Sequence, residues 1–190
     1  MPVSVIRFLL PFLALLIGPA AATKSLEETI FLFENRKVAI AVPDGFGFAS
    51  SKDDRGLITV RLADPKDKVS LQMTFLPDGE GRFASARGRK EFIHENFQEY
   101  VGPSVEKAMQ FEELDPKEGA GTYCMFTDAS LVGKSKLPPG EFQNSTTGMK
   151  AWPGVVAVFT VMSNGTTTRE YQAVLAMLRE SVRERPAPLK

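Results

Sequence analysis

Alternation of apolar and polar residues is the clearest pattern in this chain. It covers residues 38–42, 58–62 and 69–75, where every second side chain is large and apolar. A period of two places these side chains on one face of a strand, so the pattern predicts three half-buried strands. A short apolar run at residues 30–33 precedes the first of them, and the turn between the two predicts a hairpin.

Less regular stretches complete the predicted sheet. Residues 109–114 and 122–127 are expected to be strands. Residues 155–162 form a continuous, β-branched apolar run, which is typical of a central strand buried on both faces. Residues 50–55 are polar and are expected to form a loop. Residues 131–148 are expected to form a long polar connection that rejoins the sheet at residues 149–152.

A first helix is predicted over residues 84–101. Its apolar side chains recur at helical spacing and fall on one stripe. Gly102 and Pro103 are expected to end it.

A second helix is predicted near the end of the chain. Apolar residues recur there at intervals of three and four from Tyr171 to Val182. Thr167 and Glu170 have the spacing of a capping box at its start. Arg183 and Arg185 are expected near its end, where positive charge suits the helix dipole.

The first twenty-two residues have the order of a secretory signal peptide. Arg7 supplies the positive charge, residues 8–17 are apolar, and three alanines follow a Gly-Pro pair. We expect cleavage after Ala22. An uncleaved anchor is the alternative, but the apolar run has only about half of the ~20 residues needed to span a bilayer. The sequence therefore predicts a secreted or periplasmic protein with no membrane span after cleavage.

Composition narrows the classes of function. Lys plus Arg and Asp plus Glu both number 23, and loss of Arg7 with the signal peptide leaves 22 against 23, a net charge of −1. Such a balance does not suit a nucleic-acid partner. One His and one Cys cannot form a zinc site of those ligands, an iron–sulfur site or a disulfide framework. We therefore expect neither a metal site nor a cofactor.

The order of elements predicts a single α+β domain over residues 23–190, with its core at about residues 29–183. Residues 42–46 have the sequence Val-Pro-Asp-Gly-Phe after a hairpin, and the chain closes with an apolar strand, a polar turn and a helix. This layout resembles the PsbP-like fold of the exported bacterial DcrB-type proteins and of photosystem II PsbP. The resemblance implies a mostly antiparallel β-sheet with helices packed on its faces, an α/β/α sandwich. Its motifs are architectural, so it assigns no functional residue, and this chain lacks the lipid-anchor Cys.

Candidates for catalysis are His94 and Cys124. A dyad of the two would require the first helix to cover the strand that carries Cys124. We interpret His94 as a helix-surface residue and Cys124 as a small buried hydrophobe, free or bridged to another chain. No catalytic residue is therefore assigned.

The segment from residue 131 to residue 153 is the strongest candidate for binding. It carries Lys134, Lys136, Phe142 and Trp152, and long connections on rigid scaffolds often bind partners. Exposed aromatic side chains are typical interface anchors. The alternative for Trp152 is that it packs into the core. The segment also contains one of two glycosylation sequons, at Asn144 and Asn164, which matter only in a eukaryotic source.

Three hypotheses of function follow. The favoured one is an exported, non-catalytic binding or accessory protein that recognises an unknown partner through this segment. The second is a carrier of a small apolar ligand, in a pocket between helix and sheet lined by Phe92, Phe97 and Trp152. The third is an enzyme that uses Cys124 and His94.

Overall fold

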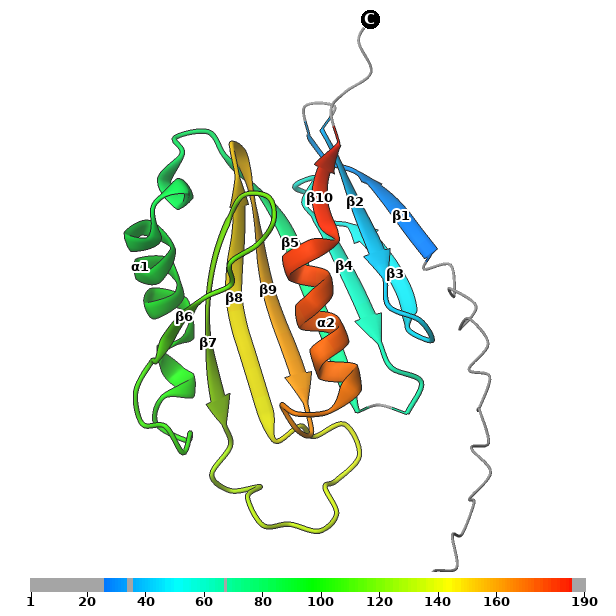
Figure 1. The fold of residues 1–190 in the computed structure, drawn as a ribbon. Helices are drawn as coiled ribbons and strands as arrows, with labels where there is room; N and C mark the ends of the chain where they lie inside the picture. Colours follow the sequence, from blue (N-terminus) through cyan, green and yellow to red (C-terminus); the bar gives the residue numbers. More distant parts are fainter. Residues whose placement is uncertain (1–25, 34–35, 67, 186–190) are drawn as a thin grey trace, which may run out of the picture.

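The computed structural model describes residues 26–33, 36–66 and 68–185. The predicted signal peptide and its cleavage after Ala22 lie outside these residues. Within them, strands form two antiparallel sheets and two α-helices pack against them (Figure 1). The predicted α+β class with mostly antiparallel strands is therefore confirmed.

The larger sheet has seven strands in the order β3-β4-β5-β9-β8-β7-β6, and all neighbours are antiparallel. In chain order the strands are β3 (Gly47–Lys52), β4 (Ile58–Ala63), β5 (Val69–Asp78), β6 (Phe111–Glu113), β7 (Ala120–Thr127), β8 (Asn144–Trp152) and β9 (Gly154–Ser163). The apolar strand β9 lies at the centre, between β5 and β8, as its sequence predicts. Its burial is one-sided over much of its length, because Val158, Thr160 and Met162 are only half-buried.

The smaller sheet has three strands in the order β1-β2-β10. Strands β1 (Leu26–Phe31) and β2 (Lys37–Val42) form the predicted hairpin, and β10 (Val182–Arg185) pairs with the other edge of β2. The sheet therefore joins the two ends of the described chain.

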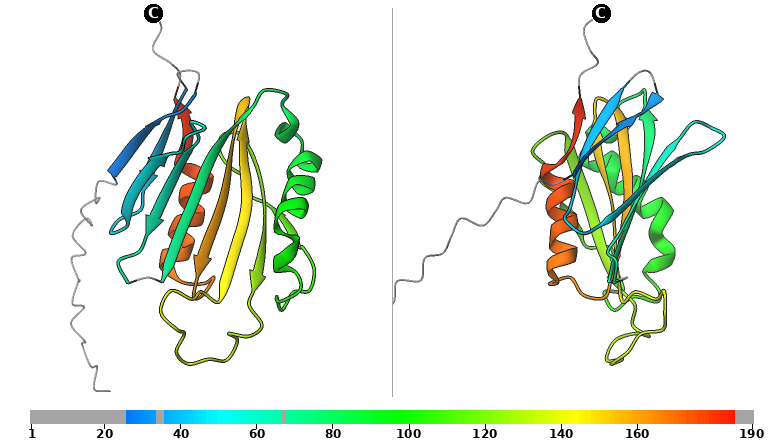
Figure 2. Two further views of the ribbon diagram at one scale, coloured as in Figure 1. Left: turned by 180° about the vertical axis from the view of Figure 1, so that it is seen from behind. Right: turned by 90° about the vertical axis from the view of Figure 1, so that its right-hand side faces the viewer.

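The two α-helices cover opposite faces of the larger sheet (Figures 1 and 2). Helix α1 (Ala86–Phe97) lies on β7 and β8, between the short 3-10 helices η2 (Arg82–Ala84) and η3 (Gln98–Tyr100). Helix α2 (Arg169–Glu180) lies against β5, β9 and β2. No helix in the described ranges is long and apolar enough to cross a membrane.

Each face of the larger sheet has its own apolar cluster. On the α2 face, Phe75 and Phe159 of the sheet belong to one cluster with Leu178 of α2 and Ile40 of the smaller sheet. The cluster beneath α1 contains Phe83, Ile93, Cys124, Phe126, Met149, Ala151 and Val156. Residues of different clusters lie on opposite faces of the sheet, so they cannot line the same pocket.

Two strands of the larger sheet differ from the prediction. Residues 50–52 are predicted to lie in a polar loop, but they belong to edge strand β3, which covers residues 47–52. Backbone hydrogen bonds to a single neighbouring strand can hold an edge strand, so its side chains need not be apolar. Strand β8 begins at Asn144 rather than at residue 149, and its Ser and Thr side chains are buried. Hydrogen bonds offset the burial of both threonines: the Thr146 hydroxyl is bonded to the Tyr171 hydroxyl at 2.7 Å, and the Thr147 hydroxyl donates to the Phe159 carbonyl at 3.3 Å.

The end of the chain also differs. Helix α2 ends at Glu180, and Arg183 and Arg185 belong to strand β10, where both pair with Glu27 of β1. Their predicted place at the helix end is therefore wrong. The capping box is wrong as well, because Thr168 is the N-cap and its hydroxyl accepts from the Tyr171 N–H at 3.3 Å.

Candidate functional site: a groove along helix α2

The four predicted binding residues do not form one site. Lys134 and Lys136 are exposed in the connection between β7 and β8, and Phe142 lies two residues before β8. Trp152 is the last residue of β8, so the whole nine-residue strand, roughly 27 Å long, lies between it and Phe142. The segment is therefore split between opposite ends of the sheet.

Trp152 is not an exposed anchor. Only 5% of it is exposed, and it belongs to the core on the α2 face, where the Lys150 ammonium lies 5.0 Å from the centre of its ring. The core alternative for Trp152 is thus correct, and its proposed exposure is wrong. Phe142 is half-buried and lines a small hollow of about 100 Å³ with Tyr100 and Ser145.

The predicted apolar pocket is also wrong in its composition. Phe92 and Phe97 pack against the cluster beneath α1, whereas Trp152 belongs to the cluster on the α2 face. The sheet separates the two groups, so no single cavity can be lined by all three.

Cys124 is buried in the fold, whereas His94 is exposed. Helix α1 does cover the strand with Cys124, but the thiol is fully buried, and burial raises its pKa to about 12. A thiol in that state is inert as a nucleophile at neutral pH. His94 is exposed on α1, and no hydrogen bond joins the two within the described ranges. The structure thus places Cys124 as a core residue, in agreement with its sequence interpretation.

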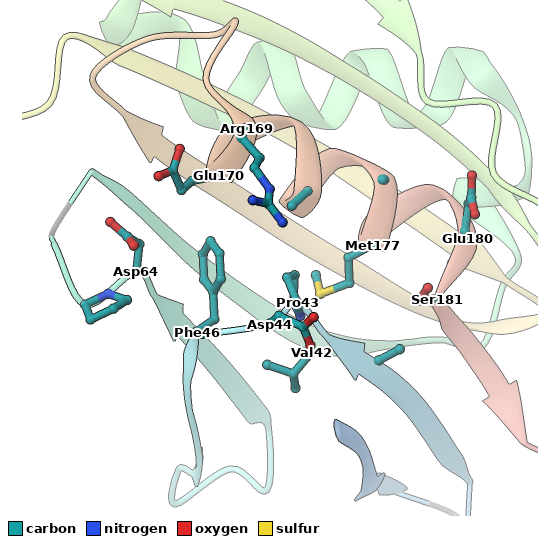
Figure 3. A pocket seen from close by; sticks show the side chains of 15 residues that line it. Val42, Pro43, Asp44, Phe46, Asp64, Arg169, Glu170, Met177, Glu180 and Ser181 are labelled. Atoms are coloured by element: carbon teal, nitrogen blue, oxygen red, sulfur yellow. The ribbon is translucent and has the colours of Figure 1, made fainter. Parts of the chain in front are cut away.

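A groove of about 530 Å³ runs along α2 (Figure 3). Helix α2 forms one wall, and the β2–β3 and β4–β5 turns form the other. The lining residues are Ala41, Val42, Pro43, Asp44, Gly45, Phe46, Asp64, Pro65, Arg169, Glu170, Ala173, Ala176, Met177, Glu180 and Ser181. The Val-Pro-Asp-Gly-Phe sequence, which appeared only architectural, therefore forms part of a surface that a ligand can reach.

Local sequence explains the wall formed by the β2–β3 turn. The Phe46 N–H donates to the Pro43 carbonyl at 3.1 Å, which closes a tight turn. Gly45 has a φ of +83°, a conformation that favours glycine. The turn brings the half-buried ring of Phe46 against the core and leaves Asp44 exposed at the rim.

Small side chains explain the opposite wall. Ala173 and Ala176 lie on the part of α2 that faces away from the sheet, and neither is fully buried. A larger residue at either position would occupy the groove. Met177, of which 3% is exposed, lies deeper and supplies apolar surface to the floor.

Three of the four carboxylates in the groove already interact with the protein. Asp64 accepts two backbone N–H groups of the β4–β5 turn, at 3.2 and 3.1 Å. Glu170 pairs with Lys68, and Glu180 pairs with Lys117, both at 3.4 Å. The pKa of Glu170 is lowered, first by its own backbone N–H and then by Lys68.

Two charged groups of the lining remain. Neither Arg169 nor Asp44 has a side-chain hydrogen bond or ion pair with any other described residue. They come from opposite walls, and the Arg169 side chain extends from α2 toward the side of the groove that carries Phe46 (Figure 3).

Buried polar contacts hold α2 in place along its length. Near its start, the hydroxyls of Tyr171 and Thr146 are hydrogen-bonded at 2.7 Å. At its end, the buried Lys150 ammonium donates to the carbonyls of Leu178 and Val182, at 2.8 and 2.5 Å. Burial lowers the pKa of Lys150 to about 8, while Glu118 opposes this change. These contacts fix the wall of the groove relative to the sheet.

Comparison with known proteins gave no match to any family model, curated protein or solved structure. Within the described part of the chain, no group of three or more His, Cys, Asp or Glu residues could hold a metal ion. Function must therefore be inferred from the groove and its charges.

The sequence contains only indirect signs of this groove. Asp44 belongs to a sequence typical of turns, and Ala173 and Ala176 lie within the predicted second helix. The predicted local structure therefore accounts for these residues without any binding role. Arg169 is the one local anomaly, because positive charge at a helix start is opposed by the helix dipole.

Proposed function

We propose that this protein is an exported, non-catalytic binding or accessory protein with a PsbP-like fold, and that the groove along α2 is its binding site. The fold assignment is supported by the position of the Val-Pro-Asp-Gly-Phe turn and by the helices on both faces of an antiparallel sheet. Export is supported by the order of the first twenty-two residues.

The volume and the mixed apolar and charged lining of the groove are the main support for the proposal. The groove has a volume of about 530 Å³, which falls within the range of small-molecule sites. It combines apolar surface from Phe46 and Met177 with two charged groups that lack protein partners among the described residues. Such a mixture is typical of sites that hold an apolar body and orient it by a few polar contacts.

Binding without catalysis is supported by the lining. It contains no His or Cys, so Ser181 has no imidazole beside it in the lining to act as its general base, and three of the four carboxylates are held by backbone N–H groups or by a lysine. The ligand expected here has an apolar part that covers the floor and a polar part at the rim.

Replacement of Ala176 by tryptophan tests the proposal. Ala176 is exposed, so the larger side chain should fill the groove without disturbing the core. The probe is 1-anilinonaphthalene-8-sulfonate, whose rings suit the apolar floor and whose sulfonate suits Arg169. We expect the wild-type protein to bind it at one saturable site and Ala176→Trp to bind it at least about tenfold more weakly, a loss of about 1.4 kcal/mol.

Gln172→Trp is the matched control, because Gln172 is also exposed on α2 but does not line the groove. Dye fluorescence should be excited directly, so that the added tryptophan does not contribute. Equal binding by both tryptophan variants and the wild type would contradict the proposal.

A further inference from the structure

We infer that the groove along α2 recognises a zwitterionic ligand, a free amino acid or short peptide with an apolar side chain, whose carboxylate binds Arg169 and whose ammonium binds Asp44. This inference rests on the proposed function and specifies its ligand class. Its basis is the balance of charge that remains in the groove once the internal pairs have been formed.

Arg169 is suited to bind a carboxylate. It is the first residue of α2, its side chain is exposed, and it reaches over the groove (Figure 3). A guanidinium can bind both oxygens of one carboxylate, which gives direction as well as affinity. The dipole of α2 opposes the positive charge of Arg169 in the unliganded protein, and a bound carboxylate would remove this unfavourable interaction.

Asp44 is suited to bind an ammonium group. The β2–β3 turn holds it at the rim of the opposite wall, where its carboxylate is exposed and has no partner among the described residues. A ligand that lies across the groove can therefore meet a positive group on α2 and a negative group on the turn.

The other charges of the lining make a singly charged ligand less suitable. Asp64, Glu170 and Glu180 are each held by backbone N–H groups or by a lysine. One positive and one negative group then remain, and a zwitterion complements both. A ligand with only an anion or only a cation would leave one of them without a partner.

The floor between the two charges suits an aliphatic side chain. Ala173, Ala176, Met177 and Phe46 line this part of the groove, and none of them offers a side-chain hydrogen-bond donor. The main contribution of this surface is burial of apolar area, which is insensitive to the charge of the ligand. Charge recognition and apolar binding can therefore be separated by experiment.

Four forms of the dipeptide Leu-Leu provide that experiment: free, N-acetylated, C-amidated and blocked at both ends. Binding is measured by isothermal titration calorimetry at neutral pH and low salt. We expect the wild-type protein to bind the free form best and each singly blocked form about tenfold more weakly, since a hydrogen bond to a charged group is lost.

Two variants test which protein residue binds each charged end of the dipeptide. Arg169→Gln is expected to abolish the preference for a free carboxylate while it keeps the preference for a free ammonium, and Asp44→Asn is expected to do the reverse. The matched controls are Lys66→Gln and Asp54→Asn, which remove exposed charges outside the lining. Both controls should keep both preferences.

Several results would overturn the inference. They are equal binding of all four forms, dependence on only one end of the dipeptide, an unchanged preference in the two groove variants, or no binding of any form. The proposed function is judged separately, because dye binding that is lost in Ala176→Trp supports the groove whatever the dipeptides do.

Discussion

Replacement of Lys150 by alanine is expected to lower the free energy of unfolding by about 3–5 kcal/mol. The change removes a fully buried side chain and leaves a cavity between β8 and α2. It also leaves the carbonyls of Leu178 and Val182 without the donor that now serves both. Relief from burying the ammonium offsets part of this loss. Urea unfolding followed by fluorescence of Trp152, the sole tryptophan, measures the effect beside the mutated site.

The pH dependence of stability isolates the role of the charge. Burial lowers the pKa of Lys150 from 10.5 in the unfolded chain to about 8 in the folded protein. Between these values the unfolded chain binds a proton that the folded protein does not, so this group adds stability as the pH rises from about 8 to 10.5. The gain is at most about 3 kcal/mol, and below pH 8 the contribution is constant.

Lys150→Met is the control for that effect, because it keeps most of the volume and cannot titrate. The stability of the wild type relative to Lys150→Met should therefore rise across this pH window. A neutral amine still has two N–H groups for two carbonyl acceptors, so deprotonation need not break either hydrogen bond. A stability difference that stays constant from pH 7 to pH 10.5 would contradict the assignment.

Alanine at Gly148 is expected to cost at least about 3 kcal/mol or to prevent folding. An added Cβ would lie 2.6 Å from three atoms, the Thr122 carbonyl oxygen, the Tyr123 Cβ and the Phe159 Cζ. The first two belong to the adjacent strand β7 and cannot move without shifting the ladder. Strand β8 is joined to α2 by the Thr146–Tyr171 and Lys150–Leu178 hydrogen bonds, so a shift of β8 would also displace the wall of the groove.

Gly102→Ala is the matched control, since an added Cβ there meets no atom within 4 Å. It should change stability by no more than about 0.5 kcal/mol. Thermal unfolding by circular dichroism compares the two variants. A loss below about 1 kcal/mol in Gly148→Ala would contradict the close packing of β7 and Phe159 around Gly148.

Sequence patterns predict the elements whose side chains determine their burial. Strands β4 and β5 and helix α2 each bury one face, so their periodicity is visible in the sequence. Strands β3 and β10 are held by backbone pairing with a neighbour, which leaves little trace in side-chain pattern. The start of β8 is concealed for a related reason, because its Ser and Thr side chains are typical of loops until their burial is known.

The groove could not be predicted from the sequence because the segments that form its walls are far apart along the chain. Residues 42–46 precede α2 by most of the domain, and their juxtaposition depends on β10 pairing with β2, a strand that the helical period conceals. Trp152 is an example of a residue whose type suggests an interface but which the fold buries. The register of β8 in the sheet determines that its side chain lies in the core on the α2 face. Neither fact is encoded in local pattern.

Whether a ligand binds along α2 is tested most directly by mapping backbone amide chemical shifts in the full chain during titration with 1-anilinonaphthalene-8-sulfonate. The proposed site predicts that shifts concentrate in residues 41–46, 64–65 and 169–181, the three segments that line the groove. The segment 131–143 and helix α1 should change little. Shifts that concentrate in either of those regions, with none along α2, would show that the groove is not the binding site.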